Sequence, residues 1–212
     1  MVFVSRLNYL DTLRRGLAKS GEVIYNGLDL SSDYFLSRAE ARNFFSQKIG
    51  LDLSGSYIYG SIGRLAYPKN YKFLINAYQE IKKIKPLVKL IIIGEGPERS
   101  KYETLIKSYR LEKEIYLLGE IKEGSRYLKA YDLFVLPSVY EGMSLSLMEA
   151  RLAEVSALAS RVGGNEEIIG KENCFMLDDM GDFISKIENQ KNQAGSPDFL
   201  VDKMVEDYIK LY

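Results

Sequence analysis

The fold is decided by residues 131–164, which read YDLFVLPSVYEGMSLSLMEARLAEVSALASRVGG. An apolar run from Leu133 to Leu136 predicts a buried strand, and a polar loop follows it. A helix over residues 144–154 and a second strand over residues 155–159 complete the unit. The helix therefore begins at the carboxyl end of a strand. Its free N–H groups and the positive end of its dipole face the crevice where open α/β sheets bind ligands.

Two glutamates flank the start of this helix. Glu141 lies in the loop before it, and Glu149 lies inside it, about a turn and a half from its start. Because helical side chains lean toward the N-terminus, Glu149 can reach the space in front of the amides. An anion on the amides, beside a hydroxyl-rich group held by two carboxylates, describes a nucleotide sugar. A structural alternative stays open, since Ser146-x-x-Glu149 also has the pattern of a capping box.

The spacing of eight residues between two glutamates is not specific by itself. It occurs three times in the chain, at Glu95/Glu103, Glu112/Glu120 and Glu141/Glu149. Only the last pair straddles a junction of strand, loop and helix.

The composition is that of an ordinary globular protein. The chain has 212 residues, of which 46% are hydrophobic and 27% charged, enough for one large domain with a substantial core. The formal charge is zero, which gives no field that favours nucleic acid as a partner. No apolar run approaches the roughly 20 residues that span a bilayer, and no signal peptide opens the chain. The single cysteine, Cys174, suits a reducing compartment, so we expect a cytoplasmic protein with a buried, inert thiol.

The residue types that are missing exclude several chemistries. The chain has no histidine, so it cannot build a Ser-His or Cys-His nucleophile, an imidazole base or a His-ligated metal site. No two aspartates stand two residues apart, so the Asp-x-Asp arrangement for a divalent metal is also missing. Asp178-Asp179 follows a strand and predicts a turn or a helix cap. We therefore predict neither a metal site nor a cofactor.

From residue 54 onward, strands alternate with helices. The apolar pattern predicts strands at residues 57–62, 88–93, 115–118 and 175–177 in addition to the two named above. Helices are predicted over residues 70–84, after residue 97 with an apolar face that includes Tyr109, near 126–131, at 166–169, at 183–188 and at 199–212. This alternation predicts an α/β fold, a Rossmann-like parallel sheet with right-handed crossovers and helices on both faces.

The two ends of the chain differ from its centre. Residues 1–30 contain only a helical pattern at 9–17 between short strands at 2–4 and 23–25, with a turn or hinge at Asn26-Gly27. These elements either dock on the later domain or belong to something missing. We therefore divide the chain into these end elements at 1–30, a Rossmann-like domain at 31–192 and a C-terminal helix at 193–212.

Other candidate ligand residues also follow predicted strands. Arg64 and Lys69 flank the loop after the first strand of the sheet, where two cations can clamp a diphosphate. The alternative is that both are solvated loop charges. Gly94-Glu95-Gly96-Pro97 resembles half of a dinucleotide fingerprint, but without the third glycine a plain turn is favoured over a nicotinamide site.

Two further segments carry open alternatives. Leu118-Gly119-Glu120-Ile121 ends a strand, where exposed backbone could read a nucleobase or simply end the strand. Gly163-Gly164 and Glu167 could flank the crevice or only cap the next helical turn.

Taken in order, these motifs resemble the C-terminal, donor-binding half of a retaining glycosyltransferase of GT-B architecture, in the glycosyl transferases group 1 family. The matching series covers nearly the whole chain and comprises Asn26-Gly27-Leu28-Asp29, Gly63-Arg64-Leu65 with Lys69-Asn70, Gly94-Glu95-Gly96-Pro97, Leu118-Gly119, Leu136-Pro137-Ser138 with Glu141-Gly142, Glu149-Ala150, and Val162-Gly163-Gly164. One departure is that Glu154 and Ser156 stand where a Gly and a Pro are common.

The resemblance implies a role for each site residue. Arg64 and Lys69, beside Gly63, would bind the donor diphosphate, and Glu149 would bind the ribose hydroxyls. Glu141 and the backbone of Gly142, Met143, Ser144 and Leu145 would hold the donor sugar and phosphate. Ile121 would meet the base through its backbone. In this assignment Glu141, Arg64 and Lys69 form the catalytic set.

The resemblance also implies the reaction and the partners. Such enzymes transfer a hexose from a nucleotide-diphosphate sugar with retention, by front-side attack and without a metal. The acceptor, a glycan or a lipid-linked glycan, is bound largely by an N-terminal Rossmann domain of which residues 1–25 resemble only the end. The resemblance therefore implies that residues 1–30 are a remnant of that domain with the interdomain linker and that residues 31–192 bind the nucleotide sugar. We expect a truncated chain with little transfer activity alone, cytoplasmic or peripheral on the inner face of the membrane.

Two other functions are open for this chain. One is a non-catalytic nucleotide-sugar-binding module that works beside a partner domain. The other is an epimerase or phosphorylase of the same fold, which the lack of histidine and of a lysine–cofactor motif disfavours.

Overall fold

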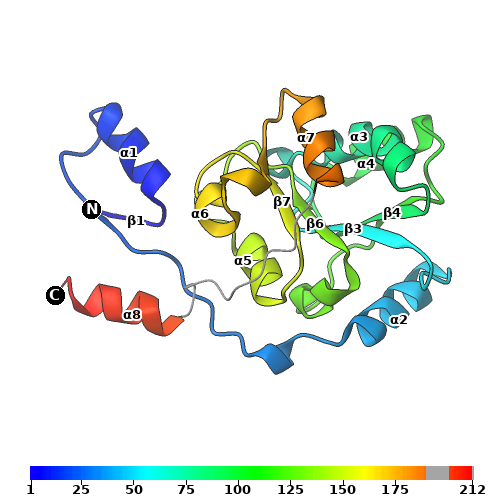
Figure 1. Cartoon of the computed structure of the whole chain (residues 1–212), viewed down its shortest axis with the longest axis horizontal. Helices are drawn as coiled ribbons and strands as arrows, with labels where there is room; N and C mark the ends of the chain where they lie inside the picture. Colours follow the sequence, from blue (N-terminus) through cyan, green and yellow to red (C-terminus); the bar gives the residue numbers. More distant parts are fainter. Residues whose placement is uncertain (190–200, 212) are drawn as a thin grey trace.

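The computed structural model describes residues 1–189 and 201–211, and a six-stranded sheet forms its centre (Figure 1). The strands pair in parallel in the order β5-β4-β3-β6-β7-β8. They are β3 (Tyr57–Ile62), β4 (Val88–Ile93), β5 (Ile115–Leu117), β6 (Leu133–Leu136), β7 (Ala157–Ser160) and β8 (Cys174–Phe175). The predicted Rossmann-like parallel sheet is confirmed.

The strand order reverses between β3 and β6. From β3 the chain runs outward to β4 and β5, returns to β6 on the other side of β3, and continues outward to β7 and β8. Tyr59 pairs with Leu133 across this junction. In open α/β sheets, ligands bind outside the carboxyl ends of the strands at such a switch point.

Helices cover both faces of the sheet, as predicted. One face is covered by α2 (Arg38–Ile49), the 3₁₀ helix η3 (Gly124–Ala130), α5 (Leu145–Leu152) and α6 (Asn165–Ile169), and the other by α3 (Tyr71–Ile84), α4 (Arg99–Ser108) and α7 (Met180–Glu188). Shorter 3₁₀ turns are η1 (Ser32–Tyr34), η2 (Tyr67–Lys69) and η4 (Lys171–Asn173).

Alternate residues of the central strands face the two cores. In β4, Ile91 and Ile93 pack with the first group of helices, whereas Leu90 and Ile92 pack with the second. This alternation explains why β4 is an unbroken apolar run, since both of its faces are buried.

Some element bounds differ from the predictions. Helix α4 ends at Ser108, so Tyr109 is 44% exposed and is not part of its buried face. Strand β7 begins at Ala157, two residues later than predicted, because Val155 closes the end of α5 by donating from its N–H to the Ala150 carbonyl (2.9 Å). The predicted helix at 126–131 is a 3₁₀ helix that starts at Gly124.

Helix α2 was missed from sequence, although it carries a start signal. Ser37 and Glu40 form a capping box, in which the Ser37 side chain accepts from the Glu40 N–H (3.3 Å) and the Glu40 carboxylate accepts from the Ser37 N–H (3.0 Å). Ala41 and Phe45 then bury one face against η3 and the sheet.

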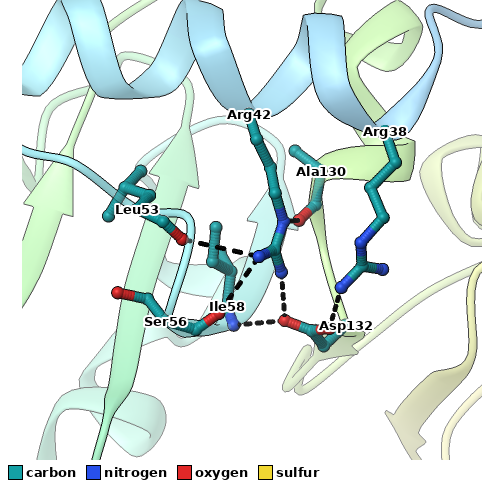
Figure 2. Close-up of polar contacts among 7 residues, drawn as sticks. All are labelled: Arg38, Arg42, Leu53, Ser56, Ile58, Ala130 and Asp132. Atoms are coloured by element: carbon teal, nitrogen blue, oxygen red, sulfur yellow. Dashed lines mark hydrogen bonds and ion pairs between the residues drawn. The ribbon is translucent and has the colours of Figure 1, made fainter.

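A largely buried arginine, Arg42, fastens α2 to the sheet (Figure 2). The Arg42 guanidinium donates to the carbonyls of Ala130 (3.2 Å), Leu53 (3.4 Å) and Ser56 (3.2 Å), and pairs with Asp132 (2.6 Å). Asp132 also accepts from the Ile58 N–H (2.6 Å) and pairs with Arg38. The network therefore joins α2 to the start of β3 and to the end of η3.

The N-terminal segment and the last helix lie beside the sheet domain, at one end of the molecule (Figure 1). Strands β1 (Val2–Phe3) and β2 (Glu22–Val23) form a parallel pair around α1 (Arg6–Arg14). Helix α1 lies three residues earlier than predicted, because Ser5 is its N-cap and accepts from the Asn8 N–H (3.3 Å).

Helix α8 (Val201–Ile209) contacts the linker, where the Val201 N–H donates to the Leu28 carbonyl (3.3 Å). Residues 190–200 and 212, which include the predicted start and end of the closing helix, lie outside the described residues. The domain bounds at 30 and 192 stay predictions. No helix in the described part of the chain is both long and apolar enough to span a bilayer.

Candidate functional site

A lysine and a glutamate from two loops meet at the switch point. Lys69 lies in η2 after β3, and Glu141 lies in the loop after β6. The Lys69 ammonium is 2.7 Å from the Glu141 carboxylate, and both side chains are largely buried, with 23% and 12% exposed. The structure thus brings together two residues that the sequence assigned to one site.

Serines hold this carboxylate in place. The Ser138 hydroxyl donates to Glu141 (2.6 Å), and the Ser160 hydroxyl from β7 donates to the Ser138 carbonyl. The Val139 N–H donates to the Pro68 carbonyl (2.9 Å), which joins the two loops directly. The position of Glu141 is therefore fixed from both sides of the switch point.

Glycines allow the neighbouring loops to approach. The Gly63 N–H donates to the Ile93 carbonyl (3.0 Å), and a Cβ at Gly94 would lie 2.0 Å from the Gly63 carbonyl oxygen. The Gly94 N–H in turn donates to the Gly119 carbonyl (2.9 Å). The segment at 94–97 is thus a turn packed on the loop that follows β3, in agreement with the prediction of a plain turn.

The side chain of Arg64 stays apart from the ion pair. It is exposed one residue after Gly63, and within residues 1–189 and 201–211 no hydrogen bond or ion pair of this side chain is found. Arg64 therefore faces solvent, and both interpretations of it, as a diphosphate ligand or as a solvated charge, stay predictions.

Helix α5 begins directly behind Glu141. Its N-cap is Ser144, which makes no side-chain hydrogen bond to the helix amides. Met143 and Ser144 are buried, whereas Leu145, the first helical residue, is 51% exposed. The capping-box alternative is wrong, because Ser146 lies inside the helix and cannot be its N-cap.

Glu149 is partly buried on α5, the helix that packs against η3. Burial raises the pKa of its carboxyl above the usual range, and a hydrogen bond from Ser125 partly opposes this shift. The Ser125 hydroxyl is itself 3.0 Å from the Tyr34 hydroxyl. Ile121 borders the same 3₁₀ helix, with its Cβ 4.0 Å from where a Cβ at Gly124 would lie.

Glu167 holds the start of α1 and does not cap its own helical turn, α6. The alternative that it flanks the crevice stays a prediction. The Glu167 carboxylate accepts from the N–H groups of Arg6 (3.0 Å) and Leu7 (3.2 Å) at the start of α1, and from the Tyr25 hydroxyl (2.7 Å). It therefore docks the N-terminal segment on the sheet domain, which is one of the two alternatives for residues 1–30. Burial and this carboxylate raise the pKa of Tyr25 to about 12.

The docked segment reaches the site loop. Gly163, at φ 52°, could not carry a Cβ, which would lie 2.0 Å from the Glu141 carbonyl oxygen. The Gly164 N–H donates to the Gly142 carbonyl (2.8 Å). A Cβ at Gly142 would lie 3.5 Å from Val4 and 3.8 Å from the Asn8 side chain. The start of α1 thus borders the loop of Glu141.

Two minor predictions are confirmed. Cys174 is buried, and burial raises the pKa of its thiol to about 12. Asp179 is the N-cap of α7 and accepts from the Asp182 N–H (2.9 Å).

Sequence reasoning missed three hydroxyl residues at the site. Ser138 was seen only as part of a motif, and Ser125 and Tyr34 were not singled out. Only the fold brings Tyr34, 91 residues before Ser125, to the side of η3. Ser138 had a usable signal, since it lies three residues before Glu141 in the same loop.

Comparison with known proteins gives a family match and similar relatives. The sequence profile of the family described as Glycosyl transferases group 1 matches residues 43–192. The chain is 30% identical over 162 residues to N-acetylgalactosamine-N,N'-diacetylbacillosaminyl-diphospho-undecaprenol 4-alpha-N-acetylgalactosaminyltransferase of Campylobacter jejuni. The aligned region covers 75% of this chain and 40% of that protein. The chain is also 30% identical over 171 residues to UDP-Gal:alpha-D-GlcNAc-diphosphoundecaprenol alpha-1,3-galactosyltransferase of Escherichia coli, with coverage of 78% and 43%.

A solved structure shares the fold. The crystal structure of Anabaena Alr3699/HepE in complex with UDP superposes with a TM-score of 0.80 at 21% identity, over 99% of this chain and 62% of that one. The chain spans about two fifths of the length of the two curated relatives.

Proposed function

Because the chain belongs to the glycosyl transferases group 1 family, we propose that it binds the donor of a retaining hexosyltransferase, a nucleotide-diphosphate sugar, at the carboxyl ends of β3 and β6. The observation that carries this proposal is the Lys69–Glu141 pair, which sets a cation beside a carboxylate at the switch point. The Lys69 ammonium offers a diphosphate a positively charged partner, and the Glu141 carboxylate offers sugar hydroxyls a hydrogen-bond acceptor.

The diphosphate would lie between Lys69 and the start of α5. Exposed Arg64 is free to close on it, and charge-assisted hydrogen bonds of this kind are worth about 1.5–3 kcal/mol each. The backbone from Gly142 to Leu145 supplies the amides of a helix N-terminus, where a negative group is favoured. Gly63 leaves room beside Lys69, since a Cβ there would lie 3.2 Å from the Lys69 Cε.

The nucleoside would extend from the diphosphate toward η3. In this pose Glu149 accepts the ribose hydroxyls, because an ionised carboxylate offers only acceptors. Ile121 would meet the base through its backbone. Glu141 would hold the hydroxyls of the donor sugar, with its position fixed by Ser138 and Lys69.

We propose transfer with retention by front-side attack and without a metal. In support, the chain has no two aspartates spaced two apart, so the side chains that hold a metal on the diphosphate in metal-dependent transferases have no counterpart here. Arg64, Lys69 and the helix amides would balance the phosphate charge instead.

We propose a glycan or a lipid-linked glycan as the acceptor. The names of the Campylobacter and Escherichia relatives both contain a diphospho-undecaprenol group, which is a lipid-linked acceptor. A cytoplasmic chain that is peripheral on the inner face of a membrane would meet such an acceptor. An N-terminal Rossmann domain outside this chain would bind it, and nucleic acid is not expected as a partner.

A non-catalytic nucleotide-sugar-binding module is the second candidate. The observation that favours it is apolar exposure on α1 and α8, where Leu7 is 46%, Leu10 38% and Ile209 69% exposed. Such a surface suits a partner domain. Adding the N-terminal half of a relative and assaying sugar transfer separates the two: product supports the transferase, and its absence with intact donor binding supports the module.

Donor binding itself is tested by calorimetry with UDP, GDP and ADP in the presence of a chelator. We expect one of the three nucleotides to bind. We expect Glu149→Ala to weaken its binding free energy by about 1–3 kcal/mol, because a ribose hydroxyl is left without its partner. Glu112→Ala, which removes an exposed glutamate from the opposite end of the sheet, is the matched control and should have no effect. Binding of none of the three at millimolar concentration would contradict the proposal.

A further inference from the structure

The two oxygens of the Glu141 carboxylate have different surroundings. The Lys69 ammonium lies 2.7 Å from Oε1, and the Ser138 hydroxyl donates to the same atom (2.6 Å). In the described ranges, 1–189 and 201–211, no hydrogen bond or ion pair reaches Oε2, which is open to solvent rather than buried. One oxygen is therefore occupied by the protein, and the other is left for a ligand.

The direction of both bonds to Oε1 is determined. An ammonium group can only donate and an ionised carboxylate can only accept, so the proton on the Ser138 oxygen points to Glu141. A carboxylate has about four acceptor positions, shared equally by its two oxygens. The bonds from Lys69 and Ser138 fill the positions on Oε1, and those on Oε2 remain.

We propose that Ser138, supported by Ser160, is a positioning residue of the donor-sugar site. It holds Oε1 of Glu141 so that Oε2 faces the crevice and accepts hydroxyls of the donor sugar. This inference rests on the proposed function, in which Glu141 binds that sugar. Ser138 itself is 0% exposed, so its role is to orient the carboxylate and not to contact the ligand.

A series of buried groups fixes Ser138 from behind. The Ser160 hydroxyl in β7 donates to the Ser138 carbonyl, and the Asn165 side-chain amide donates to the Ser160 carbonyl (3.0 Å). Ser160 and Asn165 are as fully buried as Ser138. Because water does not compete for buried partners, these groups keep one arrangement. They join the loop of Glu141 to β7 and to the start of α6.

The loop between Ser138 and Glu141 is also braced by its backbone. The Val139 N–H donates to the Pro68 carbonyl (2.9 Å), and the Gly142 carbonyl accepts from the Gly164 N–H (2.8 Å). A group that binds a ligand precisely needs its side chain locked by such supporting contacts. The hydrogen bond from Ser138 transmits this rigidity to the carboxylate.

Lys69 cannot hold the carboxylate in the same way. Its ammonium ends a flexible four-carbon chain, carries three rotatable donors, and belongs to a side chain that is 23% exposed. In the proposed function the same ammonium also contacts the donor diphosphate. A ligand that draws the ammonium toward its phosphates weakens one bond to Oε1, whereas the single proton of Ser138 stays with Glu141.

The test compares a bare nucleoside diphosphate with its sugar derivatives by calorimetry. The probe is whichever of UDP, GDP and ADP binds the wild-type chain, with UDP-glucose, UDP-galactose and their N-acetyl forms, GDP-mannose, or ADP-glucose accordingly. We expect Ser138→Ala to weaken the best-bound nucleotide sugar about tenfold, because the hydrogen bonds between Glu141 and the sugar lose their geometry. The dissociation constant of the bare nucleotide should change by less than about twofold, since it carries no hexose for Glu141 to bind.

Further variants exclude a merely structural role. Ser138→Thr keeps the hydroxyl and should restore most of the affinity for the nucleotide sugar. Ser160→Ala leaves the Ser138 hydroxyl in place and frees only its backbone, so the loss should be smaller and again confined to the nucleotide sugar. Ser46→Ala is the matched control, because its hydroxyl accepts from the Leu53 N–H (3.2 Å) ahead of β3, at the opposite end of the sheet. Both of its affinities should equal those of the wild type.

Binding of the bare nucleotide shows that a variant is folded. If Ser138→Ala is not, Ser138→Cys gives the same comparison, since a thiol is a weak donor in place of the hydroxyl.

The outcomes separate the positioning role from the proposed function. If Glu141→Ala weakens the nucleotide sugar but Ser138→Ala weakens neither ligand, or weakens both equally, the positioning role is wrong and the donor site stands. If Glu141→Ala leaves the nucleotide sugar unaffected, the proposed sugar contact of Glu141 fails, and the positioning role fails with it. Binding of none of the three nucleotides contradicts the proposed function itself.

Discussion

The ammonium of Lys69 lies 2.7 Å from the Glu141 carboxylate, although 72 residues separate them in the sequence. The two loops that carry them follow β3 and β6, the neighbours at which the strand order reverses. Parallel strands bring their carboxyl ends to one edge, so residues that follow two adjacent strands become neighbours. The pair is a direct consequence of the topology.

Removal of Lys69 should weaken the phosphate contacts of a nucleotide and leave its nucleoside contacts unchanged. We expect Lys69→Ala to weaken the binding of a nucleoside diphosphate about tenfold or more, because one charge-assisted hydrogen bond is lost. The binding of a nucleoside without phosphate should be unaffected. Lys72→Ala removes an equal charge from an exposed position three residues later and is the control. An equal loss of affinity in both variants would indicate that the overall positive charge, rather than a specific contact of Lys69, attracts the phosphates.

The two arginines that pair with Asp132 should differ strongly in their effect on stability. Arg42 is 13% exposed and Arg38 53% exposed. Arg42→Met should lower the free energy of unfolding by about 3 kcal/mol, because it leaves a buried carboxylate and three carbonyls with fewer donors. Arg38→Met should cost less than about 1 kcal/mol, since exposed ion pairs contribute little. Denaturant titration measures both, and similar losses would show that the network is not the anchor of α2.

The end of α5 offers a stabilising substitution. Glu154 has φ 58°, its N–H donates to the Arg151 carbonyl (3.0 Å), and the next N–H bonds to the Ala150 carbonyl (2.9 Å). This is a Schellman motif with glutamate in the left-handed position that glycine prefers. Glu154→Gly should raise the free energy of unfolding by about 0.5–1 kcal/mol. Glu154→Ala keeps the left-handed cost and should gain nothing, so an equal gain would point to the lost charge instead.

Glu167 should control how tightly the N-terminal segment docks. Glu167→Ala removes the acceptor of two α1 amides and of the Tyr25 hydroxyl, a loss of about 1–2 kcal/mol. Hydrogen exchange of the amides of Arg6–Arg14 should become about tenfold faster, while exchange in β3 and β4 stays unchanged. Glu166→Ala changes the adjacent residue, which pairs with Arg161, and should leave α1 as it is. A uniform increase across the sheet would show global destabilisation rather than undocking.

The parts of the fold that sequence predicted well are those with strong local signals. Strands β3, β4 and β6 have the predicted bounds, because a strand buried on both faces is an unbroken apolar run that polar loops interrupt. Helix α2 was missed, since only Ala41 and Phe45 are buried on it and much of its attachment is polar, through Arg42. Periodicity of apolar residues does not register an anchor of that kind.

The residues of the candidate site also differ in whether their positions could be predicted from the sequence. Lys69, Glu141 and Glu149 follow strands or open a helix, so their positions could be inferred from the order of elements alone. Tyr34 and Ser125 meet each other only through the packing of η1 and η3, and Glu167 contacts a segment 160 residues earlier. Contacts between loops of distant segments leave no periodic trace in the sequence.

The most direct test of the proposed donor site finds where the nucleotide binds, rather than how tightly it binds. Amide ¹H–¹⁵N spectra recorded during titration with UDP, GDP or ADP report which backbone groups meet the nucleotide. We expect the largest shifts at Gly63, at Ile121 and from Gly142 to Leu145. Shifts centred instead on the groove of Lys48, Arg99 and Tyr116, at the outer edge of the sheet, would contradict it.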